Sequence, residues 1–194
     1  MRKHILLFAL LFLGAFQSFS QWNSLSLETK ASFRAIRSNG SHIWIGGTRG
    51  SVLHSSDGGE HFSVSQVPGA DSLDFRDLAI LDENTVLLMS AGPAENEAAK
   101  VFRTENGGKS WELVFQIKEK GYFFDAILWE GKQGLILSDP AGSFYGLIRI
   151  SDKGRKFELL TLTNHPTLQK GEAAFAASGS SLQKTKKGYY IVTG

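Results

Sequence analysis

The sequence predicts an all-β protein built from repeated units of about four short strands, which is the plan of a β-propeller. Three observations support this prediction. A turn-forming octapeptide recurs at a nearly constant spacing, a phenylalanine motif recurs in the same register, and the apolar runs between them are short and rich in β-forming residues. Repeat periods of roughly 40–50 residues are typical of radially arranged or stacked units.

The octapeptide combines a hydroxyl residue, an Asp or Asn, a glycine and an aromatic residue. It occupies 55–62 and 104–111 and, in a weaker form, 150–157, with central residues 49 and 46 residues apart. An Asp or Asn side chain accepts hydrogen bonds from nearby backbone N–H groups, and glycine adopts the left-handed conformation of a tight turn at no steric cost. We therefore expect a structural role for Ser55, Asp57, Gly59, Phe62, Thr104, Asn106, Gly108, Trp111, Asp152, Gly154 and Phe157.

The phenylalanine motif marks the first strand of each unit. It begins at Phe33, Phe75 and Phe124, and we expect a fourth copy over 175–178, at spacings of 42, 49 and 51 residues. Two independent repeats in one register favour a propeller over an irregular β fold.

Further apolar runs supply the other strands of each unit. The second strands are expected at 43–45, 85–89, 134–137 and 189–192, and the third strands at 51–54, 101–103 and 147–150. Each run is short and is bounded by glycine or other turn-forming residues, as strands of an antiparallel sheet are. The aromatic residue of each octapeptide then begins a fourth strand.

Residues 1–20 have the pattern of a signal peptide and not of a strand. A basic start, 1–4, is followed by an apolar run of 12 residues, 5–16, and by small residues that a signal peptidase reads. The run is shorter than the ~20 residues needed to span a bilayer. We expect cleavage before Gln21, a partial propeller domain over 21–194, and a periplasmic or secreted location.

Charge and composition restrict the classes of partner. The chain has 21 basic and 19 acidic residues, and Arg2 and Lys3 fall in the predicted leader, so the mature protein is formally neutral. A neutral chain lacks the basic surface typical of nucleic-acid binding. There is no cysteine for a disulfide framework, and the histidines have no metal-ligand spacing. We expect no cofactor, no metal, no nucleic acid, and no transmembrane segment after cleavage.

Several motifs together resemble a known family. They are 33–34, 74–77, 123–126, 138–140 and 173–179. The chain resembles exported bacterial propellers with BNR or Asp-box repeats, which are similar to the photosystem II stability and assembly factor family. The resemblance implies a propeller that binds other proteins and, in photosynthetic members, assists the assembly of a membrane complex. Ile150 departs from the motif, since it replaces a hydroxyl residue, and the chain contains about three and a half units, so we expect an incomplete propeller.

The resulting functional prediction is a non-catalytic module that binds a protein partner in the periplasm or at a membrane surface. The alternative is a sialidase-like glycoside hydrolase, because the Asp-box also occurs in sialidases. Such an enzyme needs an arginine cluster and a tyrosine nucleophile with a glutamate partner, and no Tyr–Glu spacing of that kind is visible. A third alternative, an oxidoreductase, rests only on how some relatives are labelled.

We expect the candidate binding site where the first strands meet near the propeller axis. Arg34, Arg76 and Asp125 each follow a motif phenylalanine, so we expect equivalent positions in successive units. The competing interpretation is that each arginine pairs with a nearby carboxylate and only ties units together. The other candidates for the same rim are Asp74, Asp77, Asp139 and Ser178.

Overall fold

The computed structural model describes residues 24–161, 163, 168–177 and 179–194. These residues form three four-stranded sheets and one two-stranded sheet, all antiparallel, with the strands of each sheet in chain order. The first unit is β1 (Phe33–Asn39), β2 (His42–Gly47), β3 (Ser51–Ser55) and β4 (Ser63–Gln66). The second is β5 (Asp74–Ile80), β6 (Val86–Ala91), β7 (Lys100–Thr104) and β8 (Glu112–Gln116), with a 3-10 turn η1 (Ala94–Asn96) between β6 and β7.

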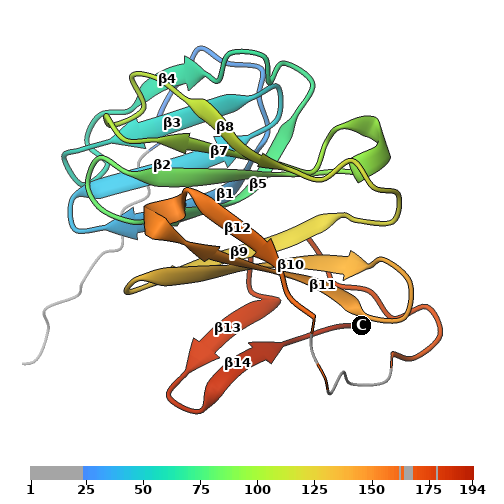
Figure 1. Ribbon diagram of the computed structural model, residues 1–194. Coiled ribbons are helices and arrows are strands. Elements are labelled where there is room, and N and C mark those ends of the chain that lie inside the picture. The colour runs from blue at the N-terminus through green and yellow to red at the C-terminus, as the bar shows by residue number, and fades with distance from the viewer. Residues whose placement is uncertain (1–23, 162, 164–167, 178) are drawn as a thin grey trace, which may run out of the picture.

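The third unit contains β9 (Phe124–Glu130), β10 (Gln133–Pro140), β11 (Tyr145–Ser151), the 3-10 turn η2 (Asp152–Gly154) and β12 (Lys156–Leu159). The fourth has only β13 (Leu182–Thr185) and β14 (Gly188–Ile191). The units follow one another from blue to red in Figure 1, and the first strands β1, β5, β9 and β13 contact one another in that order. Among the described strands none of the fourth unit pairs with the first, so the predicted incomplete propeller is confirmed.

The hydrophobic core lies between units and not within them. Trp44 and Val52 of the first unit pack with Phe75 and Leu88 of the second. A second cluster joins the second unit to the third, and a third, smaller cluster joins the third unit to Ala174 and Leu182. Each sheet therefore depends on its neighbours to bury its apolar faces, as repeat units generally do.

In two of the three octapeptide turns the Asp or Asn side chain accepts a backbone N–H. The N–H of His61 lies 3.0 Å from Asp57 Oδ1, and the N–H of Ser110 lies 2.9 Å from Asn106 Oδ1. The hydroxyl residue adds further hydrogen bonds. The Ser55 hydroxyl donates to Asp57 Oδ1 at 2.7 Å and accepts from the Gly59 N–H at 2.9 Å. In the second turn the Thr104 hydroxyl donates to Asn106 Oδ1 at 3.0 Å and accepts from the Gly108 N–H at 2.9 Å. The side chain at the hydroxyl position thus satisfies the backbone donors of the turn.

The third turn is built differently because Ile150 has no hydroxyl to offer. Its side chain is fully buried in the core, and the chain continues as the 3-10 turn η2. Asp152 and Lys153 adopt left-handed conformations, with φ of 50° and 52°. Lys153 occupies the place that a glycine occupies in the other two turns, so this turn carries the backbone strain that glycine avoids there.

One predicted strand is wrong. The fourth phenylalanine motif does not form a strand over its described residues, 175–177, and the first strand of the fourth unit begins only at Leu182. Phe75 and Phe124 are fully buried between units, whereas Phe175 is 59% exposed. Without a further sheet among the described residues to cover it, Phe175 cannot anchor a strand as the other phenylalanines do.

Two predictions fall outside the described residues: the signal peptide over 1–20 and the candidate site residue Ser178. Within the part of the chain that the structure describes, no helix has the length and apolar character needed to cross a membrane.

Replacing Thr104 with valine should destabilise the second unit. The change keeps the shape of the side chain but leaves the Gly108 N–H without its acceptor, which costs about 1–2 kcal/mol. Urea unfolding followed by tryptophan fluorescence measures the effect. Thr161→Val is the control, since Thr161 is exposed. Equal stability of the two variants would contradict a structural role for the turn.

Candidate functional site

A β-bulge recurs at the start of three first strands. In the first unit Phe33 pairs with Gly47 and Ala35 with Gly46, which leaves Arg34 as the extra residue. The second and third units have the same irregularity, and there the extra residues are Arg76 and Asp125. A bulge points the side chain of its extra residue in a direction different from the one it would have in a regular strand. The three residues after the motif phenylalanines therefore occupy one structural position in successive units.

Arg34 and Arg76 meet at one carboxylate. Their Nε atoms lie 3.4 and 2.8 Å from Oδ2 of Asp74, the first residue of β5. The side chain of Arg34 is 47% exposed and that of Arg76 is 30% exposed. We call these three residues the arginine cluster. It carries two positive charges and one negative charge and faces solvent.

Asp74 holds the two arginines of the cluster together. Its Oδ1 atom is buried without a hydrogen-bond partner among the described residues, while Oδ2 faces the arginines. Arg76 donates a hydrogen bond from Nε to this oxygen at 2.8 Å, and Arg34 approaches it as an ion pair, its Nε atom 3.4 Å away. A guanidinium held by Nε still presents N–H donors that can bind a second carboxylate in parallel.

Asp77 lies in the interior and not on the rim. Its Oδ1 atom is 2.7 Å from Nη2 of Arg37 on β1, and its Oδ2 atom accepts the N–H of Ile127 on β9 at 2.9 Å. Oδ1 also accepts the N–H of Leu78 at 2.9 Å. One carboxylate therefore joins the first strands of three units. Burial raises the pKa of Asp77 to about 6, and the Arg37 guanidinium and the two N–H donors oppose that rise.

Asp125 is also buried, at 1% exposure, and neither of its carboxylate oxygens has a hydrogen-bond partner among the described residues. Burial raises its pKa to about 8, and the nearby Asp139 carboxylate acts in the same direction. The Asp139 backbone N–H opposes this rise in pKa, although its own hydrogen bond goes to the Phe123 carbonyl at 2.9 Å. Asp139 itself accepts the Ala174 N–H at 2.9 Å, and burial raises its pKa as well.

The structure thus divides the predicted site residues into three groups. Arg34, Arg76 and Asp74 form one exposed cluster, Asp77 is a buried link between units, and Asp125 and Asp139 lie at the junction of the third and fourth units. The pairing of Arg76 with Asp74 was one of the two alternatives that the sequence left open.

Sequence reasoning did not link Asp77 to two residues that contact it, Arg37 and Gly179. Arg37 carries no repeat signal, because the equivalent positions in the second and third units are Ala79 and Leu128. Gly179 approaches both Arg37 and Asp77 so closely that a Cβ atom would collide with them, and its φ of +65° also favours glycine. Only the folded arrangement brings this fourth-unit glycine against the first two units.

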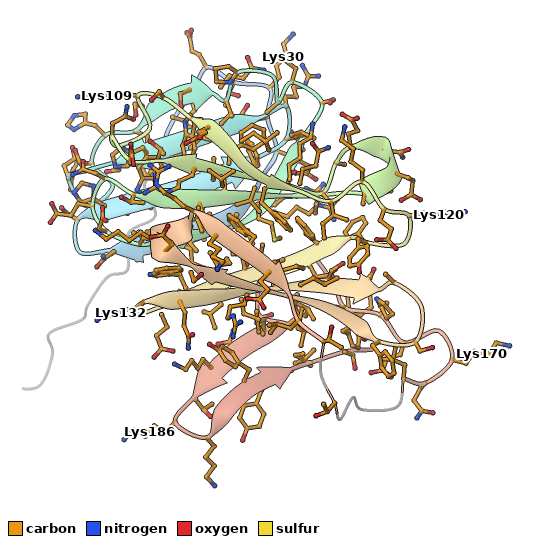
Figure 2. The ribbon with its side chains drawn as sticks, in the orientation of Figure 1. Lys30, Lys109, Lys120, Lys132, Lys170 and Lys186 are labelled. Carbon is orange, nitrogen blue, oxygen red and sulfur yellow. The ribbon has the colours of Figure 1, made fainter. Side chains whose placement is uncertain are left out.

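Positive charge outside the arginine cluster is dispersed. The labelled lysines in Figure 2, among them Lys30, Lys120 and Lys186, project from separate parts of the molecular outline. Within the described residues, no group of three or more His, Asp or Glu side chains is arranged to hold a metal ion.

The chain is similar to photosystem II assembly factors. It is 32% identical over 101 residues to the photosystem II assembly lipoprotein Ycf48 of Synechococcus sp. (strain CC9902), a match that covers 48% of this chain and 27% of that protein. The solved structure of YCF48 bound to D1 peptide has a TM-score of 0.60 at 15% identity and covers 81% of this chain and 51% of that one.

YCF48 from Cyanidioschyzon merolae has a TM-score of 0.58 at 17% identity, covering 77% of this chain and 45% of that one. At these identities the structural matches establish the propeller fold, and the resemblance read from the sequence is confirmed. The chain spans about half the length of these solved structures and about a quarter of the curated relative. No family model matches the chain.

Removing the Asp77 carboxylate should weaken the contacts between units. Asp77→Ala leaves the buried Ile127 N–H without an acceptor and Arg37 without its partner, and we expect a loss of about 2–4 kcal/mol at pH 7. Urea unfolding measures this loss of unfolding free energy. Asp71→Ala is the control, because Asp71 is exposed and, among the described residues, is bonded only to Gln66. A loss no larger than that of the control would contradict the linking role.

The pH dependence of that loss has a definite sign. The folded pKa of Asp77, about 6, lies above the ordinary value of 3.8. The part of its stabilisation that depends on protonation is therefore complete at low pH and is lost as the pH rises through 6, while its hydrogen bonds remain. The difference in unfolding free energy between wild type and Asp77→Ala should therefore be larger at pH 4 than at pH 7.

Proposed function

We propose that this protein is an exported, non-catalytic propeller module with Asp-box repeats, and that its arginine cluster docks an acidic segment of a partner protein. The single observation that carries the proposal is the convergence of two arginines from successive units on one carboxylate at an exposed position. A local positive site on an otherwise neutral protein suits an acidic partner group.

The geometry of the cluster supports capture of a carboxylate. Asp74 holds Arg76 through a hydrogen bond from Nε and draws Arg34 into an ion pair, so both guanidinium groups are oriented toward one carboxylate before a ligand arrives. Pre-ordered side chains lose less conformational entropy on binding than free ones do. An incoming Asp, Glu or chain-terminal carboxylate would take the outer Nη donors and would meet a net charge of +1.

The relatives support a polypeptide as the partner. One is a photosystem II assembly lipoprotein, and another was solved with a D1 peptide. For this chain we propose an extended peptide segment of a protein in the periplasm or at the outer surface of a membrane. The location rests on the leader-like residues 1–20.

Neutralising either arginine should weaken capture of an acidic peptide without unfolding the protein. The probe is a fluorescein-labelled decapeptide of alternating Glu and Ser, with a Lys–Ser peptide of equal length for comparison. Hydrogen bonds to charged groups are worth about 1.5–3 kcal/mol, so Arg34→Gln and Arg76→Gln should each raise Kd about tenfold in anisotropy measurements. The loss should be larger at low salt, because screening is weaker there.

The matched control for these variants is Arg149→Gln. Arg149 has the same side-chain exposure as Arg34, 47%, and is also paired with a carboxylate, that of Glu158. It should bind the acidic peptide like wild type. Equal weakening by Arg149→Gln would mean that net charge and not the cluster governs binding, and would overturn the proposal.

The hydrolase alternative is tested with a fluorogenic sialoside, for which we expect no turnover above buffer. The structure places Tyr145 within electrostatic range of the Glu172, Asp139 and Asp125 carboxylates, so that burial and these charges together raise its pKa, and the spacing did not reveal this. The charges that act on Tyr145 are all negative, however, and Arg34 and Arg76 are bound to Asp74 in other units. Hydrolysis that depends on Tyr145 would establish the alternative.

A further inference from the structure

Carboxyl groups gather without a cation at the junction between the third and fourth units. Asp125 is fully enclosed with both oxygens unpartnered, and Asp139 holds the fourth unit through the N–H of Ala174 at 2.9 Å. Elsewhere in the described chain buried carboxylates are paired, as Asp77 is with Arg37. A buried carboxylate beside another carboxylate is strongly disfavoured unless one of them takes up a proton.

Among the described residues no cation is paired with either carboxyl group, and the cations of the neighbouring strands are bound to other carboxylates. Tyr145 on β11 and Glu172 in the fourth unit are the titratable groups on one side. The charged residues of the other neighbouring strands are already engaged. They are Arg76 bound to Asp74, Asp77 bound to Arg37, and Lys184 on β13 bound to Glu130. Strand β6 has no titratable residue.

We propose that Asp125 and Asp139 form a proton-binding latch, in which one proton, held on a carboxyl group of the pair at neutral pH, keeps the fourth unit docked on the third. We call the two residues the acid pair. Its proton resides on one carboxyl group while the other remains ionised, and on deprotonation it leaves to solvent base. No other reactant takes part.

Loss of the proton would place two negative charges in a low-dielectric junction. Such charges are stabilised by water, and water reaches the buried Asp125 carboxylate only if the residues packed around it move apart. Ala174, the residue bound to Asp139, is 4% exposed and packs in the same cluster as Leu182 of β13. Opening at Ala174 would therefore loosen 172–177 together with the β13–β14 hairpin.

The direction of the effect follows from linkage. The pKa of Asp125 is about 8 when the fourth unit is docked and returns toward the ordinary 3.8 when the junction opens. The docked state thus binds the proton more tightly. Its stabilisation is complete below about pH 4, decreases as the pH rises, and is exhausted once the pH passes 8. Because the two groups interact, they titrate as a pair.

Hydrogen–deuterium exchange with mass spectrometry tests this on the intact chain. Protection factors, normalised for intrinsic exchange, are compared between pH 5 and pH 8 for peptides covering β13–β14. We expect a decrease of at least tenfold in wild type and less than twofold for peptides of β1–β4 in the same samples. Unchanged protection of β13–β14 across this range would overturn the latch.

Asp125→Asn keeps the shape of the side chain and mimics its protonated form. In this variant the protection of β13–β14 should stay high and nearly constant from pH 5 to pH 8. Asp71→Asn, at an exposed carboxylate, should behave like wild type. If Asp125→Asn retains the wild-type pH dependence, the proton is bound elsewhere and the proposal is wrong.

A second measurement needs no variant at Asp125. Carboxyl carbon NMR shifts of wild type should show the acid pair titrating in two steps, one of them above pH 7. In Asp139→Asn the remaining Asp125 carboxyl should titrate at lower pH than the upper step of the pair, because the neighbouring charge is gone. Ordinary titration of both groups near pH 4 in wild type would overturn the proposal independently of exchange.

Discussion

The arrangement of the units depends on the buried carboxylate of Asp77. It lies where the first strands of three units meet, and it accepts Arg37 from β1 and the Ile127 N–H from β9. Burying a charge is costly, and that cost is offset only if its partners are correctly placed. The carboxylate therefore favours one register of the three strands, because a shift of any of them would leave it buried without its partners.

A single backbone irregularity has three different outcomes because its surroundings differ. The bulge after each motif phenylalanine presents Arg34, Arg76 and Asp125 at equivalent positions. The first two reach solvent and share Asp74, whereas Asp125 is buried on β9, the strand that contacts β13 of the fourth unit. The same position therefore becomes an exposed cationic cluster at one side of the arc and a buried acidic junction at the other.

The repeats lose regularity along the chain, and the structural changes follow the sequence changes. Turns with a hydroxyl at the first position are closed by side-chain hydrogen bonds, and the turn that has Ile150 there becomes a strained 3-10 turn. The fourth unit departs furthest, since Phe175 is exposed and its first strand starts late at Leu182. Its docking rests on a small apolar cluster and on hydrogen bonds such as that from Ala174 to Asp139. A weakly held unit of this kind is where local opening is expected.

The sequence by itself determined the all-β class, the period of the units, the second and third strands, and the incomplete propeller. These features are local or periodic: β-forming runs, turn residues and a repeated phenylalanine each act within one unit. Tertiary structure alone decided which charges meet. Arg37 lies 40 residues from Asp77 and Asp139 lies 35 residues from Ala174, and neither pair has a repeat signal. Such contacts arise from packing between units, so the ionisation and exposure of Asp77 and Asp125 could not be read from the chain.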